Sequence, residues 1–94
     1  ESALREGHAS PGAWLLFGNA LALSGAPSAA LDMLERGVAA FPDDGMLRFT
    51  LGKYYLRAGF RLERARELLQ WCVDNGTPAE QLDEARAMLA RLPR

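Results

Sequence analysis

The sequence predicts an all-α fold in which antiparallel helix pairs stack side by side, and three observations lead to this prediction. Apolar residues recur at intervals of three and four, which places them on one face of an α-helix. Glycine and proline interrupt this pattern where helix ends are expected, and no stretch alternates apolar and polar residues as a half-buried strand does. The pattern of one helix pair also returns further along the chain.

The first helix is expected over residues 11–24. Ser10 suits the N-cap, and Pro11 suits the first helical position, where its missing N–H would have no partner in any case. Gly25 follows as a residue whose left-handed conformation can close the last turn. The apolar face carries Trp14, Phe17 and Leu21.

Two more helices are expected over residues 27–40 and 45–58. Pro42 ends the first of them, and Asp43 and Asp44 place negative charge at the start of the next, where the helix dipole favours it. The apolar faces carry Leu31, Leu34 and Val38 in one helix and Leu51 and Tyr55 in the other.

The last two helices are expected over residues 61–75 and 78–91. Gly59 and Gly76 close the helices before them, and Thr77 and Glu80 have capping-box spacing at the start of the last one. The apolar faces carry Leu62, Ala65, Leu69, Cys72 and Val73, then Leu82, Ala85 and Leu89.

An internal repeat appears when the sequence is shifted by 34 residues, which places Gly18 on Gly52 and Gly25 on Gly59. We expect Gly18 and Gly52 to let the two helices of a pair approach closely, because a Cβ there would push them apart. The same shift aligns Leu15 with Phe49, Phe17 with Leu51, Leu21 with Tyr55 and Ala22 with Leu56. A shift of 35 aligns Ala30 with Ala65, Leu34 with Leu69 and Val38 with Val73.

These residues resemble the tetratricopeptide repeat family, whose pattern is W-x2-L-G-x2-Y, then A-x3-F, then P. The resemblance covers roughly residues 11–78 and implies a short right-handed α-solenoid that binds other proteins. The first unit matches at Trp14, Phe17, Gly18, Leu21, Ala30, Leu34 and Pro42, and the second at Leu51, Gly52, Tyr55, Ala65, Leu69 and Pro78. Arg48 stands where the second unit would carry the first aromatic residue.

The repeats predict four segments. Arg86 stands where the two repeats have glycine, so a further helix could not dock closely on the last one, which we expect to cap the array. The expected segments are residues 1–10 (the end of a preceding repeat helix, or a tail), 11–44 (first repeat), 45–77 (second repeat) and 78–94 (C-terminal capping helix).

Composition and charge argue against several functional classes. The 94 residues carry 11 Lys and Arg against 12 Asp and Glu, so no cationic excess is available to neutralise nucleic-acid phosphates. No stretch approaches the roughly 20 apolar residues of a spanning helix, so direct membrane insertion is not expected. Lys53 is the one lysine beside many arginines, a bias typical of GC-rich bacterial genomes. Separately, a cytoplasmic location is favoured over a periplasmic one.

Few residues could carry chemistry. His8 has no Asp, Cys or Ser spaced to act with it, and Cys72 lies on an apolar helix face as a packing thiol does. One Cys and one His cannot build a zinc site, and the adjacent acids Asp83 and Glu84 diverge on a helix. We therefore expect no enzyme, no metal and no cofactor.

A partner-binding surface is expected on the first helix of each pair, because these helices line the concave face of such an array. Within the family, an Asn at the place of Asn19 and nearby cations help some members to clamp a C-terminal carboxylate; Leu15 stands where that clamp has Lys, so the full clamp is absent. Lys53 and Arg57 either hold an acidic segment or simply solvate the groove. The expected surface comprises Leu15, Asn19, Leu23, Met46, Phe49, Lys53, Leu56 and Arg57.

Two functional hypotheses follow. In the first, the chain is an interaction module that binds a peptide or a partner protein in this groove. In the second, it is a structural or self-associating segment of a longer solenoid with no ligand of its own. Two repeats bury little apolar surface, and a homodimer would bury more of it.

Overall fold

The computed structural model describes residues 10–93, and within them the chain is all-α, as predicted. A short 3₁₀ helix precedes the last α-helix. The elements are α2 (Pro11–Leu23), α3 (Pro27–Ala40), α4 (Gly45–Ala58), α5 (Leu62–Asn75), the 3₁₀ helix (Ala79–Gln81) and α6 (Leu82–Arg91). The segment expected to end a preceding repeat helix lies, apart from Ser10, outside the described residues.

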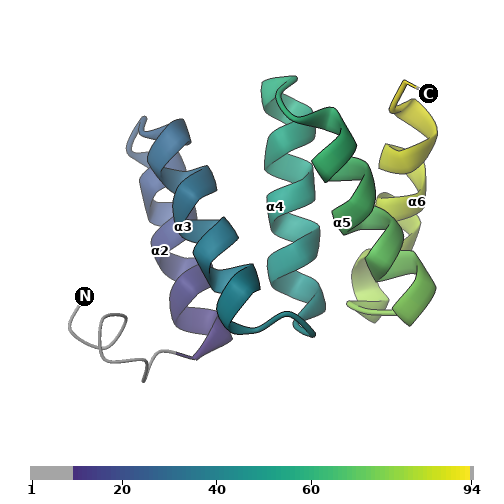
Figure 1. The fold of residues 1–94 in the computed structure, drawn as a ribbon, viewed down its shortest axis with the longest axis horizontal. Helices are drawn as coiled ribbons and strands as arrows, with labels where there is room; N and C mark the ends of the chain where they lie inside the picture. The colour runs from purple at the N-terminus through teal and green to yellow at the C-terminus, as the bar shows by residue number, and fades with distance from the viewer. Residues whose placement is uncertain (1–9, 94) are drawn as a thin grey trace.

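The helices form two antiparallel pairs, α2–α3 and α4–α5, followed by α6 (Figure 1). Within each pair the packing is extensive; α3 also packs against α4, and α5 against α6. In addition, α4 contacts both α2 and α6, the first helices on either side of it. The array is therefore two layers deep, with α2, α4 and α6 in one layer and α3 and α5 in the other, and measures 39 × 27 × 19 Å.

Glycine sets the close approach inside each pair, as predicted. A Cβ built on Gly18 of α2 would lie 2.6 Å from Cγ of Leu34 in α3. A Cβ on Gly52 of α4 would lie 2.9 Å from Cγ of Leu69 in α5. Both distances are too short for carbon atoms in contact, so the two leucines occupy space that only glycine leaves open.

The core lies where α4 meets its neighbours. Tyr55 is the largest fully buried side chain, and α4 supplies more of the buried residues than any other described helix. The other fully buried large side chains are Leu34, Leu47, Leu51, Leu68, Leu69 and Cys72.

Two of the predicted helix starts are confirmed by their caps. The Ser10 hydroxyl accepts a hydrogen bond from the Ala13 N–H at 3.3 Å, and the Asp44 carboxylate accepts one from the Leu47 N–H at 2.9 Å. Each satisfies a backbone donor that has no partner inside its helix.

The capping box predicted at Thr77 is wrong. Pro78 is extended, with φ −76° and ψ 136°, and no side chain caps the 3₁₀ helix that follows. The Thr77 hydroxyl instead lies beside the start of α4, where a Cβ on Gly45 would come within 2.7 Å of it. Packing against another helix therefore decides the position of Thr77, and α6 begins later than its local sequence suggests.

Among residues 10–93, four have a positive φ angle. Gly25, Gly59 and Gly76 do so after their helices, as predicted, with φ between 65° and 87°. Arg61 also does, with φ 52°, at the N-cap of α5. A left-handed conformation is unfavourable for a residue with a side chain, and no sequence pattern predicts it here.

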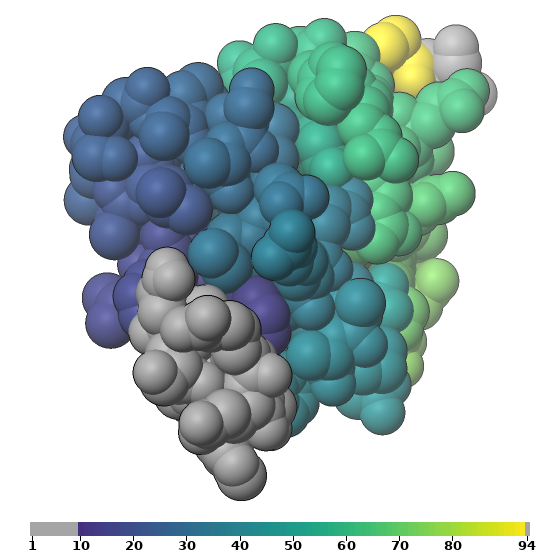
Figure 2. Space-filling model, turned by 60° about the vertical axis from the view of Figure 1, so that its left-hand side comes forward, coloured from purple at the N-terminus to yellow at the C-terminus, as the bar shows by residue number. Residues whose placement is uncertain are grey.

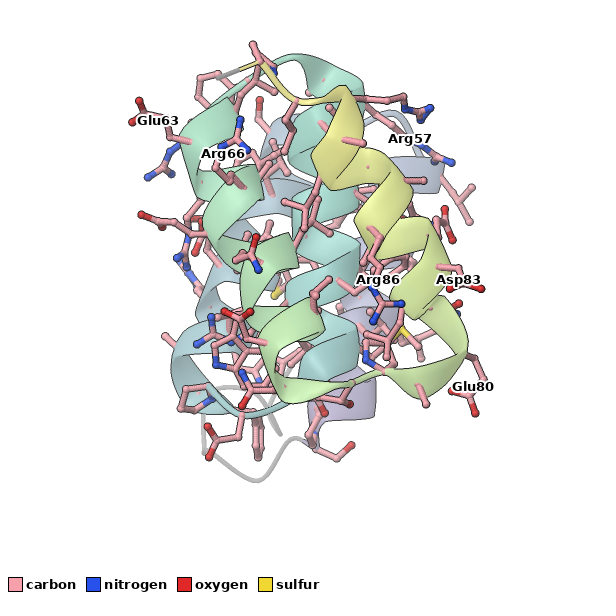
Figure 3. All side chains as sticks on the ribbon, turned by 90° about the vertical axis from the view of Figure 1, so that its right-hand side faces the viewer. Arg57, Glu63, Arg66, Glu80, Asp83 and Arg86 are labelled. Carbon is pink, nitrogen blue, oxygen red and sulfur yellow. The ribbon has the colours of Figure 1, made fainter. Side chains whose placement is uncertain are left out.

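The outer face of α6 is polar. Ala85 and Met88 are buried against the array, whereas Arg86 is exposed and pairs with Asp83 at 3.5 Å. Figure 3 shows Arg86 projecting from the outward side of the helix. Arg86 therefore extends into solvent at the position where each repeat has the glycine that lets its two helices pack closely.

Candidate functional site

The predicted binding surface falls on α2 and α4, in the layer of first helices. We call the surface that α2, α4 and α6 present on the side away from α3 and α5 the first-helix face. Leu23 is 89% exposed and Arg57 is exposed, whereas the others, except Phe49, are half-buried. The half-buried residues are Leu15, Asn19, Met46, Lys53 and Leu56.

Phe49 does not belong to this surface. Its side chain is only 2% exposed and is part of the core. The Lys53 ammonium nitrogen lies 5.3 Å from the centroid of its ring. Alignment with the half-buried Leu15 suggested that Phe49 would be accessible, but α4 is more enclosed than α2.

Asn19 is held by a residue that the sequence analysis did not single out. The hydroxyl of Tyr54 in α4 donates a short hydrogen bond to the amide oxygen of Asn19 in α2. This bond ties the two first helices together and orients the amide. Tyr54 lies one repeat and one residue beyond Asn19, which is a spacing that could have identified it.

A hollow of about 340 Å³ lies between α4 and α6 and is bordered by charged side chains of both helices. Arg57 of α4 and Glu80 and Asp83 near the start of α6 extend toward this same side, whereas Glu63 and Arg66 of α5 extend toward the opposite one (Figure 3). The hollow is lined by Lys53, Leu56, Arg57, Glu84, Met88 and Arg91.

A polar network links the two helix pairs on the side of the second helices. The Glu35 carboxylate of α3 accepts hydrogen bonds from the Arg64 guanidinium at 2.9 and 3.1 Å and from the Tyr55 hydroxyl at 2.7 Å. Arg61 donates to the Tyr55 hydroxyl at 3.2 Å. Arg64 is thus an inter-pair contact, with less than a third of its side chain exposed.

This network changes the acid–base properties of its members. Burial alone would raise the pKa of Glu35, but hydrogen bonds from Arg64 and Tyr55 outweigh it, so the pKa lies below the usual value of 4.5. Burial and the bond to Glu35 raise the pKa of Tyr55 to about 12. At neutral pH Glu35 is therefore ionised and Tyr55 keeps its proton.

The chemistry-bearing residues do not form a catalytic group in the described region. Cys72 is fully buried, its Sγ lies 3.5 Å from the Gly45 carbonyl oxygen, and burial raises its thiol pKa to about 11. This confirms Cys72 as a packing thiol. His8 lies outside the described residues. Within residues 10–93 no group of three or more His, Cys, Asp and Glu side chains is placed to hold a metal ion, and no helix is long and apolar enough to cross a membrane.

A tetratricopeptide repeat family model matches residues 11–54, which cover the α2–α3 pair and most of α4. No curated protein and no solved structure matches the chain. Together with the observed helix pairs, the match supports an all-α helical repeat of the tetratricopeptide type. Modules of this type are generally non-catalytic and typically bind proteins or peptides.

Proposed function

We propose that the chain is a protein–protein interaction module that binds an extended peptide segment along its first-helix face. The observation that carries this proposal is the combination of apolar and cationic side chains on one side of the array. Leu23 is almost fully exposed, and Lys53, Arg57 and Arg91 border the hollow between α4 and α6 against one acid, Glu84. Such a surface suits a segment with apolar and acidic residues.

The polar groups on this face favour a ligand that offers acceptors. Tyr54 occupies the amide oxygen of Asn19, which leaves the two N–H donors of the amide for a partner. Lys53 and Arg57 add charged donors further along the face. We infer that they hold an acidic segment rather than only solvate the groove, because both converge on a single hollow.

The test compares three proteins against an array of immobilised decapeptides that combine leucine with aspartate or glutamate. Wild type is expected to bind a subset of them, and Lys53→Glu/Arg57→Glu to lose about tenfold in affinity, or about 1.4 kcal/mol. Arg36→Glu/Arg66→Glu is the matched control, since it makes the same change of charge on the second helices, and it should bind as wild type does. Equal binding by all three proteins would remove this proposal.

A second candidate function is self-association through α2. No charged residue occurs among the 13 residues of α2, and Leu16 and Leu23 are 68% and 89% exposed. A helix that is apolar all round is normally covered on every side. The opposite edge of the array, on α6, is charged, so the match for one α2 face is the α2 face of another copy, arranged about a two-fold axis.

The area available predicts a weak dimer. A helix of 13 residues is about 20 Å long, so two of them in contact bury an area near the lower limit of specific interfaces, about 1,000 Å². Light scattering should show the mass rise with concentration for wild type and for Ala39→Glu, a matched change on α3. Leu16→Glu should stay monomeric. A wild-type chain that is monomeric at every concentration would contradict self-association.

A further inference from the structure

A cleft lies between the two helix pairs, lined by the start of α3 and the end of α4. The α2–α3 and α4–α5 turns lie at this same end of the molecule (Figure 1). The cleft consists of two hollows of about 490 and 290 Å³. Both are lined by Pro27, Leu31 and Ala58, so they adjoin each other. From the side of the first pair, the surface around the α4–α5 turn lies beside the first turns of α3 (Figure 2).

The space exists because the walls of the cleft carry small side chains. Ala22 and Ala30 line the smaller hollow, Ser28 lines the larger one, and Ala58 lines both. Leu31 and Phe60 are the larger apolar side chains of the larger hollow, and Phe60 is 55% exposed. The cleft thus offers an apolar surface that a bulky side chain from outside could cover.

One end of the larger hollow is polar and held in place. Arg61 has the left-handed backbone described above, and its guanidinium lies over the Tyr55 ring, 5.6 Å from the centroid. The same guanidinium donates one hydrogen bond to Tyr55, which leaves other N–H donors at the edge of the hollow. An unfavourable backbone conformation that positions a charged side chain beside a cleft points toward a binding role.

The charges around the cleft favour a negatively charged ligand. Its lining contains two acids, Asp32 and Glu35, and two cations, Arg57 and Arg61. Each acid is paired with a cation outside the lining: Asp32 with Arg36 at 3.4 Å and Glu35 with Arg64 at 2.9 Å. Arg61 approaches Glu35 only to 4.0 Å, and no ion pair of Arg57 is present within residues 10–93. The positive charge of the lining is therefore less fully compensated than the negative charge.

We infer that this cleft binds a peptide in which an aromatic side chain stands next to a carboxylate. The aromatic ring lies between Leu31 and Phe60, and the carboxylate accepts hydrogen bonds from Arg61. The site differs from the proposed groove in Leu31, Phe60 and Arg61, which do not belong to the first-helix face, whereas Arg57 borders both. Its ligand would be held between the two pairs and not along the first helices.

Two small probes separate the parts of this proposal. N-acetyl-phenylalanine carries the ring and a carboxylate, whereas N-acetyl-phenylalaninamide carries the same ring without charge. In ¹⁵N–¹H spectra of the full chain, both should shift the amides of residues 28–35 and 57–62, and the carboxylate form should bind about tenfold more tightly. Shifts elsewhere, or none, would overturn the proposal.

Variants with matched controls test the assigned residues. Arg61→Gly suits the left-handed backbone and removes the cation, so it should abolish the preference for the carboxylate while both probes still bind. Arg66→Gln, on the opposite face of α5 from the cleft, should keep the preference. Ala58→Leu should fill the cleft and weaken both probes, whereas Ala87→Leu on the exposed side of α6 should not.

Failure of the cleft proposal can be distinguished from failure of the proposed binding along the first-helix face. The single variant Lys53→Glu tests the first-helix face without changing the lining of the cleft, whereas Arg61→Gly changes the cleft and leaves that face unchanged. If Arg61→Gly retains the carboxylate preference, the cleft assignment is wrong whatever the groove binds.

Discussion

The helices α2 and α4 occupy equivalent places in the two repeats but differ in burial in a way that their composition does not suggest. α2 contains no charged residue, yet among its residues, all of which the structure describes, Gly18 alone is buried. α4 contains Arg48, Lys53 and Arg57, yet seven of its residues are buried. Among the described residues α4 has neighbouring helices on both sides whereas α2 has them on one side, so the place among the helices decides burial more than hydrophobicity does.

The largest expected effect tests this contrast with one leucine from each helix. Leu51 of α4 is fully buried, and Leu51→Ala should cost about 2–5 kcal/mol because a cavity remains. Leu16 of α2 is mostly exposed, and Leu16→Ala should change stability by less than about 0.5 kcal/mol. Urea unfolding followed by circular dichroism measures both. Similar losses for the two variants would show that α2 is covered in solution.

An intermediate effect is expected at the packing glycines. Gly52→Leu should overpack the α4–α5 pair and cost about 1–3 kcal/mol, because α4 is confined on both sides and cannot move away from Leu69. Gly18→Leu meets Leu34 in a similar way but should cost less, since α2 can shift outward. Thermal unfolding compares them, and each kcal/mol corresponds to about 4–8 °C. An unchanged melting temperature for Gly52→Leu would rule out this packing.

The smallest expected effect concerns the link between the two pairs. Glu35→Gln weakens the bonds from Arg64 and Tyr55 and should cost about 1 kcal/mol at pH 7. Folding lowers the pKa of Glu35 from its value of 4.5 in the unfolded chain. The ionised carboxylate therefore stabilises the fold fully at pH values above 4.5, and this contribution is lost as the pH falls through the lower pKa of the folded protein. Wild type and Glu35→Gln should therefore converge in acid.

A control separates this link from surface charge in general. Glu63→Gln changes the same group on the exposed side of α5 and should change stability by less than about 0.5 kcal/mol at pH 7. If Glu35→Gln followed Glu63→Gln at pH 7, the Glu35 network would contribute nothing to the joining of the pairs.

The helices could be predicted because their signals are local. Ser10 and Asp44 cap their helices as expected, and the glycines after α2, α4 and α5 take the left-handed conformation. The Gly18 and Gly52 matches also predicted correctly where the two helices of each pair approach closely. Each of these features depends on a few neighbouring residues or on an exact repeat.

Errors arose where distant residues compete. Thr77 has the sequence of a cap but packs beside Gly45, and Phe49 aligns with a half-buried position but is enclosed in the core. The Glu35–Arg64 contact joins residues 29 positions apart in different repeats, and no periodicity indicates which acid an arginine will meet. For the same reason Phe49, one residue of the predicted binding surface, lies in the core, and the rest of that surface stays a prediction.

The sequence by itself determined the helices, their pairing and the glycines at which the pairs close, because backbone caps and steric exclusion act over short distances or recur with the repeat. Only the tertiary structure decided that α4 is enclosed while the more apolar α2 is not, that Arg61 takes a left-handed backbone beside Tyr55, and that small residues leave a cleft between the pairs. These features depend on the relative orientation of the two helix pairs. That orientation is set by many contacts between residues far apart in the chain.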